Sequence, residues 1–107
     1  MISYERRKEK RFPISCPARL ELNGLGQKSV MNLTTANVSA GGLYFETHNP
    51  RPTGTPVLIE AVLPHRIFRR FGGNQRVLIE GTGRVLRSET SGMAVGFEGD
   101  YRIRQLQ

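Results

Sequence analysis

Length, composition and charge limit the classes of protein to which this sequence can belong. The chain has 107 residues, of which 37% are hydrophobic and 23% are charged, so we expect one globular domain with a single modest core. Sixteen Lys and Arg residues against nine Asp and Glu residues give a net charge of +7 at pH 7, which favours anionic partners. No apolar run approaches the length of a membrane span and the first residues are charged rather than apolar, so we expect no membrane span, no secretory signal and a cytoplasmic location.

Residue counts also argue against catalysis and against a metal site. The chain has one cysteine, Cys16, and two histidines, so it has neither an internal disulfide nor a cluster with metal-ligand spacing. Its single aspartate is Asp100, and we find no Ser-His-Asp or Cys-His arrangement and no phosphate-transfer loop. We therefore predict a protein that is not an enzyme, with no metal and no cofactor.

The first twelve residues form a basic segment, with the run Arg6-Arg7-Lys8-Glu9-Lys10-Arg11. They are too polar to enter a core, so we predict a flexible N-terminal arm over residues 1–12. Arg7 and Arg11 form an Arg-x-x-x-Arg motif with Arg6 just ahead of it, and guanidinium groups can bind phosphate through two parallel hydrogen bonds. Alone, such a run is also typical of a solvated tail. We expect an anionic ligand to order the arm.

The rest of the chain is predicted to be β-structure. Glycine and proline interrupt every helical window, while apolar and polar residues tend to alternate. Six strands are predicted, at residues 14–22, about 29–38, 43–47, 57–63, 75–88 and 93–98. Short strands with tight turns favour a closed antiparallel barrel over residues 13–99, because closure removes exposed edges.

Several residues mark irregular positions in these predicted strands. Pro17 indicates an edge position or a bulge, and Asn23-Gly24 indicates a turn after the first strand. Gly81 and Gly83 predict curvature within the fifth strand. Asp100 is a candidate cap for one or two helical turns, so residues 100–107 are predicted to be a short C-terminal tail or helix.

A second motif, Asn37-Val38-Ser39-Ala40-Gly41-Gly42, lies at the end of the second predicted strand. Asn37 and Ser39 are two residues apart and so share a face of an extended segment, while Gly41 and Gly42 allow a ligand to approach the main chain. The alternative is an ordinary turn held by bonds from side chain to backbone. Together the two motifs predict a site for a polyphosphate or a nucleotide, with Arg6, Arg7, Arg11, Asn37, Ser39, Gly41 and Gly42 as its residues.

An Arg-x-x-x-Arg motif before a six-strand pattern, with Asn-x-Ser-x-x-Gly at the end of the second strand, resembles the PilZ family of cyclic di-GMP receptors. Arg7 and Arg11 match the first motif, while Asn37, Ser39 and Gly42 match the second. Residues 81–85 and 92–97 are similar to the last two strands of the family.

The resemblance implies a six-stranded antiparallel barrel of the split-barrel type that binds cyclic di-GMP. It implies a bacterial signalling receptor or adaptor without catalysis, whose arm folds over the ligand and whose altered surface signals to a downstream protein partner. Arg7 and Arg11 would bind phosphate, guanine or both, because guanine O6 and N7 form an acceptor pair that arginine reads. In the family, an arginine just before the first motif often accompanies an intercalated ligand dimer, which gives Arg6 a role.

Two other functions compete with this interpretation. Small β-barrels with basic arms also bind RNA or DNA, but they interleave aromatic and basic residues on a strand face, and here only Tyr44 and Phe45 come close. We therefore expect no nucleic-acid partner. The other alternative is a degenerate family member that acts only through protein contacts, although the motif residues of this chain are intact.

Overall fold

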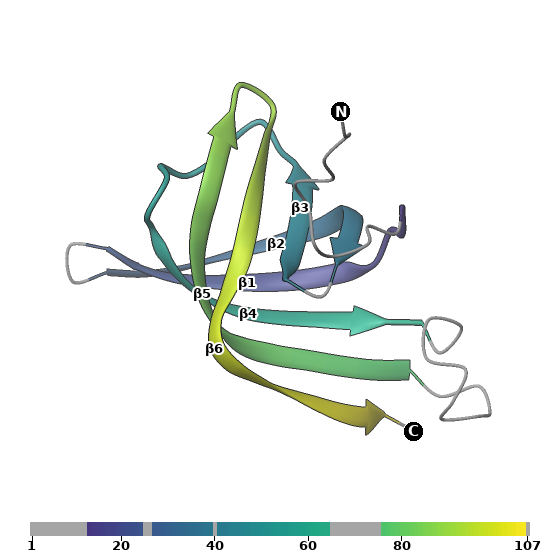
Figure 1. The fold of residues 1–107 in the computed structure, drawn as a ribbon. Helices are drawn as coiled ribbons and strands as arrows, with labels where there is room; N and C mark the ends of the chain where they lie inside the picture. Colours follow the sequence, from purple (N-terminus) through teal and green to yellow (C-terminus); the bar gives the residue numbers. More distant parts are fainter. Residues whose placement is uncertain (1–12, 25–26, 40, 65–75, 107) are drawn as a thin grey trace, which may run out of the picture.

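A computed structural model describes residues 13–24, 27–39, 41–64 and 76–106 of the chain (Figure 1). Six antiparallel strands close into a barrel in the order β1-β2-β3-β6-β5-β4. The strands are β1 (Pro17–Gly24), β2 (Gln27–Ser39), β3 (Gly42–Glu46), β4 (Pro56–Leu63), β5 (Arg76–Glu89) and β6 (Gly92–Leu106). The predicted all-β, six-stranded barrel is confirmed.

The described residues contain no helix that could cross a membrane.

Strand alternation explains how the core fills. Side chains at every second position point into the barrel, and those that are at most 1% exposed include Leu20, Phe45, Ile59, Ala61, Leu63, Val77, Val85, Met93 and Val95. Each strand contributes to this set except β2, whose buried positions are Thr35 and Val38. One core therefore holds all six strands in a fixed register.

The C-terminal part of the chain differs from the sequence prediction. β6 continues to Leu106 instead of ending at residue 98, and residues 101–106 pair with residues 76–81 of β5. The helical turns predicted after Asp100 were therefore wrong for the described residues. An open edge of β5 offers backbone partners to the alternating Tyr101 and Ile103, and this pairing outweighs a weak helix cap.

The ends of β1 test two local predictions. Pro17 is the first residue of the strand and pairs with Thr34 of β2 but with no residue of β4, so of the two predicted positions it takes the edge and not the bulge. Asn23 and Gly24 are still paired with Lys28 and Gln27, so the turn lies beyond the predicted Asn23-Gly24.

β5 and β6 bend together at irregular positions. Their register shifts between Gly81 and Gly83, as the curvature prediction required, and again between Val85 and Arg87. Figure 1 shows the result: the first half of β5 and the last half of β6 turn to run beside β4, with β6 at the outer edge of this layer. The bend separates the barrel end near β3 from the layer that carries the C-terminus.

Candidate functional site

The second motif lies at the β2–β3 hairpin, on the outer side of the barrel. Val38 is buried and pairs with Leu43, while Asn37 and Ser39 on either side of it are half-buried. The β2–β3 register shifts between Thr35 and Asn37, which lets Thr35 and Val38 both face the core. The bulge thus directs the Asn37 and Ser39 side chains to the same outer face.

Ser39 and Gly42 close this hairpin. The Ser39 Oγ donates a long hydrogen bond of 3.4 Å to the Gly42 carbonyl, and the two residues are register partners. A bond of this length is weak, so the hydroxyl can exchange this partner for a ligand atom at small cost.

The motif glycines have a structural role in the barrel. Gly42 is buried opposite Gly96, and a Cβ at Gly42 would overlap the Val95 carbonyl oxygen. The Phe97 N–H donates to the Gly41 carbonyl at 3.1 Å. The close approach that Gly42 allows is therefore made by β6, and the barrel needs glycine there whether or not a ligand is bound.

A buried polar cluster ties the start of the described chain to β2. Thr35 is 2% exposed, and its Oγ donates to the Ile14 carbonyl at 2.6 Å and accepts from the Cys16 N–H at 2.9 Å. The Thr35 N–H in turn donates to the Cys16 carbonyl at 2.9 Å. Burial raises the pKa of the Cys16 thiol, although its contact with the Thr35 hydroxyl acts in the opposite direction. Residues 14–16 are thus bound to Thr35, which lies two positions before Asn37 in β2.

Arg6, Arg7 and Arg11 lie outside the described residues, so the structure does not test their predicted role. Residues 65–74 also lie outside the described residues. The structure does describe residues 14–16, which follow the arm and are held against Thr35 of β2.

A row of side chains continues outward from Asn37 across the strands. Asn37 is opposite Tyr44, Tyr44 is opposite Ala94, and Ala94 is opposite Arg87. The Arg87 guanidinium lies 5.7 Å from the centre of the Tyr44 ring, within the range of a cation–π contact. The small Ala94 leaves room between the two larger side chains.

Glu89 fixes this pair in place. It accepts a hydrogen bond from the Tyr44 hydroxyl at 2.7 Å and another from the Arg87 Nε at 3.0 Å. The hydrogen bond to Glu89 raises the pKa of Tyr44, and the same bond, helped by Arg87, lowers the pKa of Glu89. A Cβ at Gly92 would overlap the Tyr44 hydroxyl, so the β5–β6 turn also holds the ring.

From the sequence, Tyr44 was noted only as an aromatic residue on a strand face, and Arg87 and Glu89 were missed. Their spacing puts both on one face of β5, which was a usable signal. Their position beside Tyr44 depends on the register shift between Val85 and Arg87, and no local pattern in the sequence indicates that shift.

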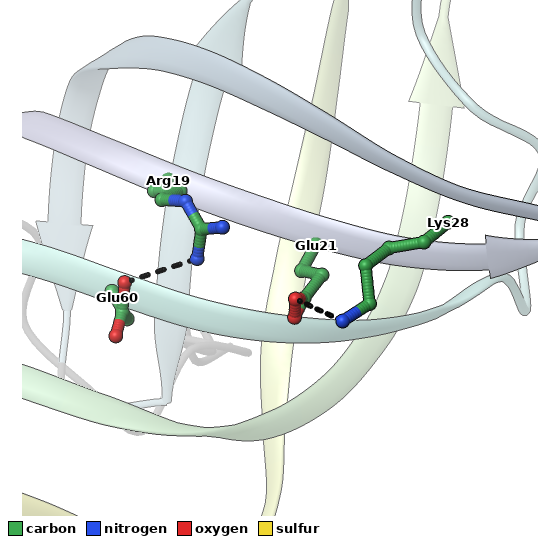
Figure 2. Close-up of polar contacts among 4 residues, drawn as sticks. All are labelled: Arg19, Glu21, Lys28 and Glu60. Atoms are coloured by element: carbon green, nitrogen blue, oxygen red, sulfur yellow. Dashed lines mark hydrogen bonds and ion pairs between the residues drawn. The ribbon is translucent and has the colours of Figure 1, made fainter.

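A second outer face, over β1, β4, β5 and β6, carries both charges and is a poor anion site. It contains a shallow groove of about 440 Å³ whose lining includes Arg19, Glu60, Glu80 and Arg102. Figure 2 shows Arg19 paired with Glu60 and Lys28 paired with Glu21, each at 3.4 Å. Arg19 and Lys28 are paired with carboxylates, and the groove is also lined by Glu80 and Asp100, so the face offers little net attraction to phosphate.

Among the residues that the structure describes, no three His, Cys, Asp or Glu side chains are grouped so that they could hold a metal ion.

Comparisons with known proteins agree with the fold. A family model described as PilZ domain matches residues 5–107. A solved structure, the crystal structure of the PilZ domain of CeSA from a cellulose synthesizing bacterium, has 22% sequence identity and a TM-score of 0.56, and the match covers 85% of this chain and 82% of that chain. At this identity the structural likeness shows the fold alone. Among curated proteins none matches.

The family match includes the Arg-x-x-x-Arg motif, the Asn-x-Ser-x-x-Gly motif and all six strands. Because it spans nearly the whole chain, this protein belongs to the PilZ domain family.

Proposed function

We propose that this chain is a cyclic di-GMP receptor or adaptor domain in bacterial second-messenger signalling, acting in the cytoplasm and without catalysis. The observation that carries the proposal is the anchoring of residues 14–16 to β2, beside Asn37 and Ser39. This contact brings the base of the basic arm to the second motif. Family membership and the net charge of +7 support the same conclusion.

Chain length allows the two motifs to share one ligand. Arg11 precedes Ile14 by three residues, so its Cα lies within about 11 Å of the Ile14 Cα even if the chain is fully extended. Thr35 binds the Ile14 carbonyl, and Asn37 follows Thr35 by about 7 Å along β2. Arg7 is one motif length further along the arm, within about 25 Å of Ile14.

The chemistry of these residues suits the ligand. Cyclic di-GMP has two phosphodiesters and two guanines, and arginine forms paired hydrogen bonds with either group. The Asn37 amide can both donate to and accept from a base edge, and the Ser39 hydroxyl can do the same. Next to them the Tyr44 ring, held by its hydrogen bond to Glu89, offers an aromatic surface on which a guanine can stack.

Arm closure is the mechanism that we propose. The arginines of residues 6–11 repel one another, and a dianionic ligand removes this repulsion while it joins the arm to the β2–β3 face. The closed arm alters the surface that a downstream protein partner contacts. Arg6, just ahead of the first motif, would bind a second cyclic di-GMP molecule stacked on the first.

Isothermal titration with cyclic di-GMP at physiological salt tests the proposal. We expect Arg7→Ala and Asn37→Ala each to weaken binding by about tenfold or more, because a hydrogen bond to a charged group contributes about 1.5–3 kcal/mol. Arg19→Ala is the matched control, since Arg19 is an exposed arginine paired with Glu60 on the second face, and its affinity should equal that of the unmodified protein. A stoichiometry near two that falls to one in Arg6→Ala would support the role of Arg6.

Two results would contradict this function. Absence of heat and of a thermal shift at high ligand concentration would indicate a family member that acts only through protein contacts. Binding that is equally weakened by Arg19→Ala would mean that general positive charge, not the motif, attracts the ligand. A steep loss of affinity for RNA with rising salt would then favour nucleic-acid binding.

A further inference from the structure

The last part of β6 has a strand partner on one side only. β3 pairs with residues 92–96 of β6, and β5 continues to pair with residues 101–106. Within the described residues, the other edge of β6 after Phe97 has no strand beside it. Such an edge presents unpaired N–H and C=O groups that can accept another strand.

A bulge separates this edge from the closed part of the barrel. Phe97 is opposite Gly83 and Tyr101 is opposite Gly81, so residues 98–100 contain extra chain relative to β5. Gly99 lies within them with φ of 75°, a left-handed conformation that glycine adopts without strain. The bulge turns β6 away from β3, and Figure 1 shows the strand as the outer edge of the lower layer.

Charges along this edge follow an ordered pattern. Glu98 and Asp100 are acidic, Arg102 and Arg104 are basic, and all four are exposed. Between them Tyr101 is 39% exposed and Ile103 is 45% exposed, although both are large apolar side chains. Charged side chains often protect an edge strand from pairing, but here an acidic half is followed by a basic half, which a second copy running antiparallel would complement.

We propose that a second copy of this chain pairs antiparallel with this edge of β6, with the two-fold axis at Tyr101. In that register Asp100 of one copy faces Arg102 of the other, so the two charged pairs beside the axis are attractive. A two-fold axis at Asp100 or at Arg102 would instead place that residue opposite its own copy, with like charges in contact. Opposite charges directly across a ladder stabilise pairing and like charges weaken it.

Asp100 and Arg102 are the central residues of this interface. Among the described residues neither makes an ion pair, whereas Glu98 is bound to Arg84 and Arg104 is bound to Glu80 at 3.2 Å. The Asp100–Arg102 contacts between copies would therefore use charges that have no ion-pair partner among the described residues of one copy.

The apolar side chains fit the same arrangement. The two Tyr101 side chains meet across the axis. Within each copy the Tyr101 ring packs on the Phe97 ring, with 4.9 Å between the two ring centres. Aromatic pairs across a ladder add to its stability. Because the interface is self-complementary, it is of the isologous kind that gives a closed dimer rather than a filament.

Sedimentation velocity of charge-reversal variants tests this inference. The full chain is measured without cyclic di-GMP over a concentration series up to about 1 mM. The unmodified protein should show a monomer–dimer equilibrium that weakens at high salt. Asp100→Arg and Arg102→Asp should each weaken dimerisation by about tenfold or more, because each change makes two attractive contacts repulsive. The double variant should restore it. Glu46→Arg, at an exposed position on β3, is the matched control and should dimerise normally.

Circular dichroism of each variant checks that loss of dimer does not come from unfolding. A protein that stays monomeric throughout the concentration series would overturn the proposal. So would a dimer that neither reversal weakens, or one that the double variant fails to restore. The proposal is independent of cyclic di-GMP binding, which the titration experiments measure separately.

Discussion

Thr35 is the residue by which β2 holds the segment that leads into the basic arm, and Thr35→Val tests that function. The change keeps the size and branching of the side chain and removes only the hydroxyl. It eliminates the bond that this hydroxyl donates to the Ile14 carbonyl at 2.6 Å and the bond that it accepts from the Cys16 N–H at 2.9 Å. The backbone bond from Thr35 N–H to the Cys16 carbonyl can persist.

The structure gives the expected size of the effect. Cys16 is buried, so its N–H would be left without a partner, which costs about 1–3 kcal/mol. Ile14 is half-buried, so water can reach its carbonyl, and loss of the hydrogen bond to that carbonyl adds less to the free-energy cost. We expect a total loss of about 2–3 kcal/mol, a large part of the 5–15 kcal/mol that is usual for a domain of this kind.

Urea unfolding followed by circular dichroism is the appropriate assay. With a slope of about 1–3 kcal/mol per M, the midpoint should fall by about 0.7–3 M. Thr34→Val is the matched control: Thr34 is the exposed neighbour in the same strand, and its replacement should change stability by less than about 0.5 kcal/mol. Equal midpoints for the two variants would refute the reasoning that residues 14–16 are held by the Thr35 hydroxyl.

The proposed function adds a second consequence for Thr35→Val. If the anchored segment positions the arm, cyclic di-GMP must then order additional residues on binding, at a cost of about 1–2 kcal/mol each. Affinity should fall by about tenfold although no motif residue has changed. Unaltered affinity would mean that the arm reaches the ligand without this anchor.

Two further predictions concern the β2–β3 face. Gly42→Ala should lower the free energy of unfolding by about 1–3 kcal/mol, because the added Cβ would overlap the backbone of β6. The melting temperature should fall by about 4–8 °C per kcal/mol. An unchanged melting temperature would show that β3 and β6 can move apart without cost. The pKa of Tyr44, measured by NMR of ¹³C-labelled tyrosine, should exceed its ordinary value and return toward it in Glu89→Gln, because the Glu89 bond favours the neutral phenol. Because the pKa of Tyr44 is raised in the folded state, the Tyr44–Glu89 bond stabilises the fold below the unfolded-state pKa, and this stabilisation is lost as the pH rises through the folded-state pKa. A Tyr44 pKa that Glu89→Gln leaves unchanged would contradict the Tyr44–Glu89 hydrogen bond.

Sequence pattern alone could predict the barrel because its strands follow simple rules. Alternating apolar residues such as Val57, Ile59 and Ala61 fix which face of β4 is inside. Glycines at 81 and 83 indicated a bend that the register confirms. The end of β6 was missed although Tyr101 and Ile103 alternate with arginines, because residues 98–105 are all exposed and bury no apolar face. Their strand is determined by the backbone of β5, which only the tertiary structure supplies.

In the candidate site, too, some residues could be predicted from the sequence and others could not. Asn37 and Ser39 could be selected from their spacing, since two residues apart on a strand share a face. The row from Asn37 through Tyr44 to Arg87 could not, because it crosses four strands whose registers depend on two bulges. Likewise the bond between Thr35 and Ile14 joins residues 21 positions apart, and neither residue type indicates the other.

The most direct test of the central claim is an NMR titration of the ¹⁵N-labelled full chain with cyclic di-GMP. We expect large chemical-shift changes at Asn37, Ser39, Tyr44 and Arg87, together with changes in the amide signals of the arm. The Arg19–Glu60 face should stay unchanged and serves as the internal reference. Absence of shifts at saturating ligand, or shifts confined to the Arg19–Glu60 face, would contradict a ligand site formed by the two motifs.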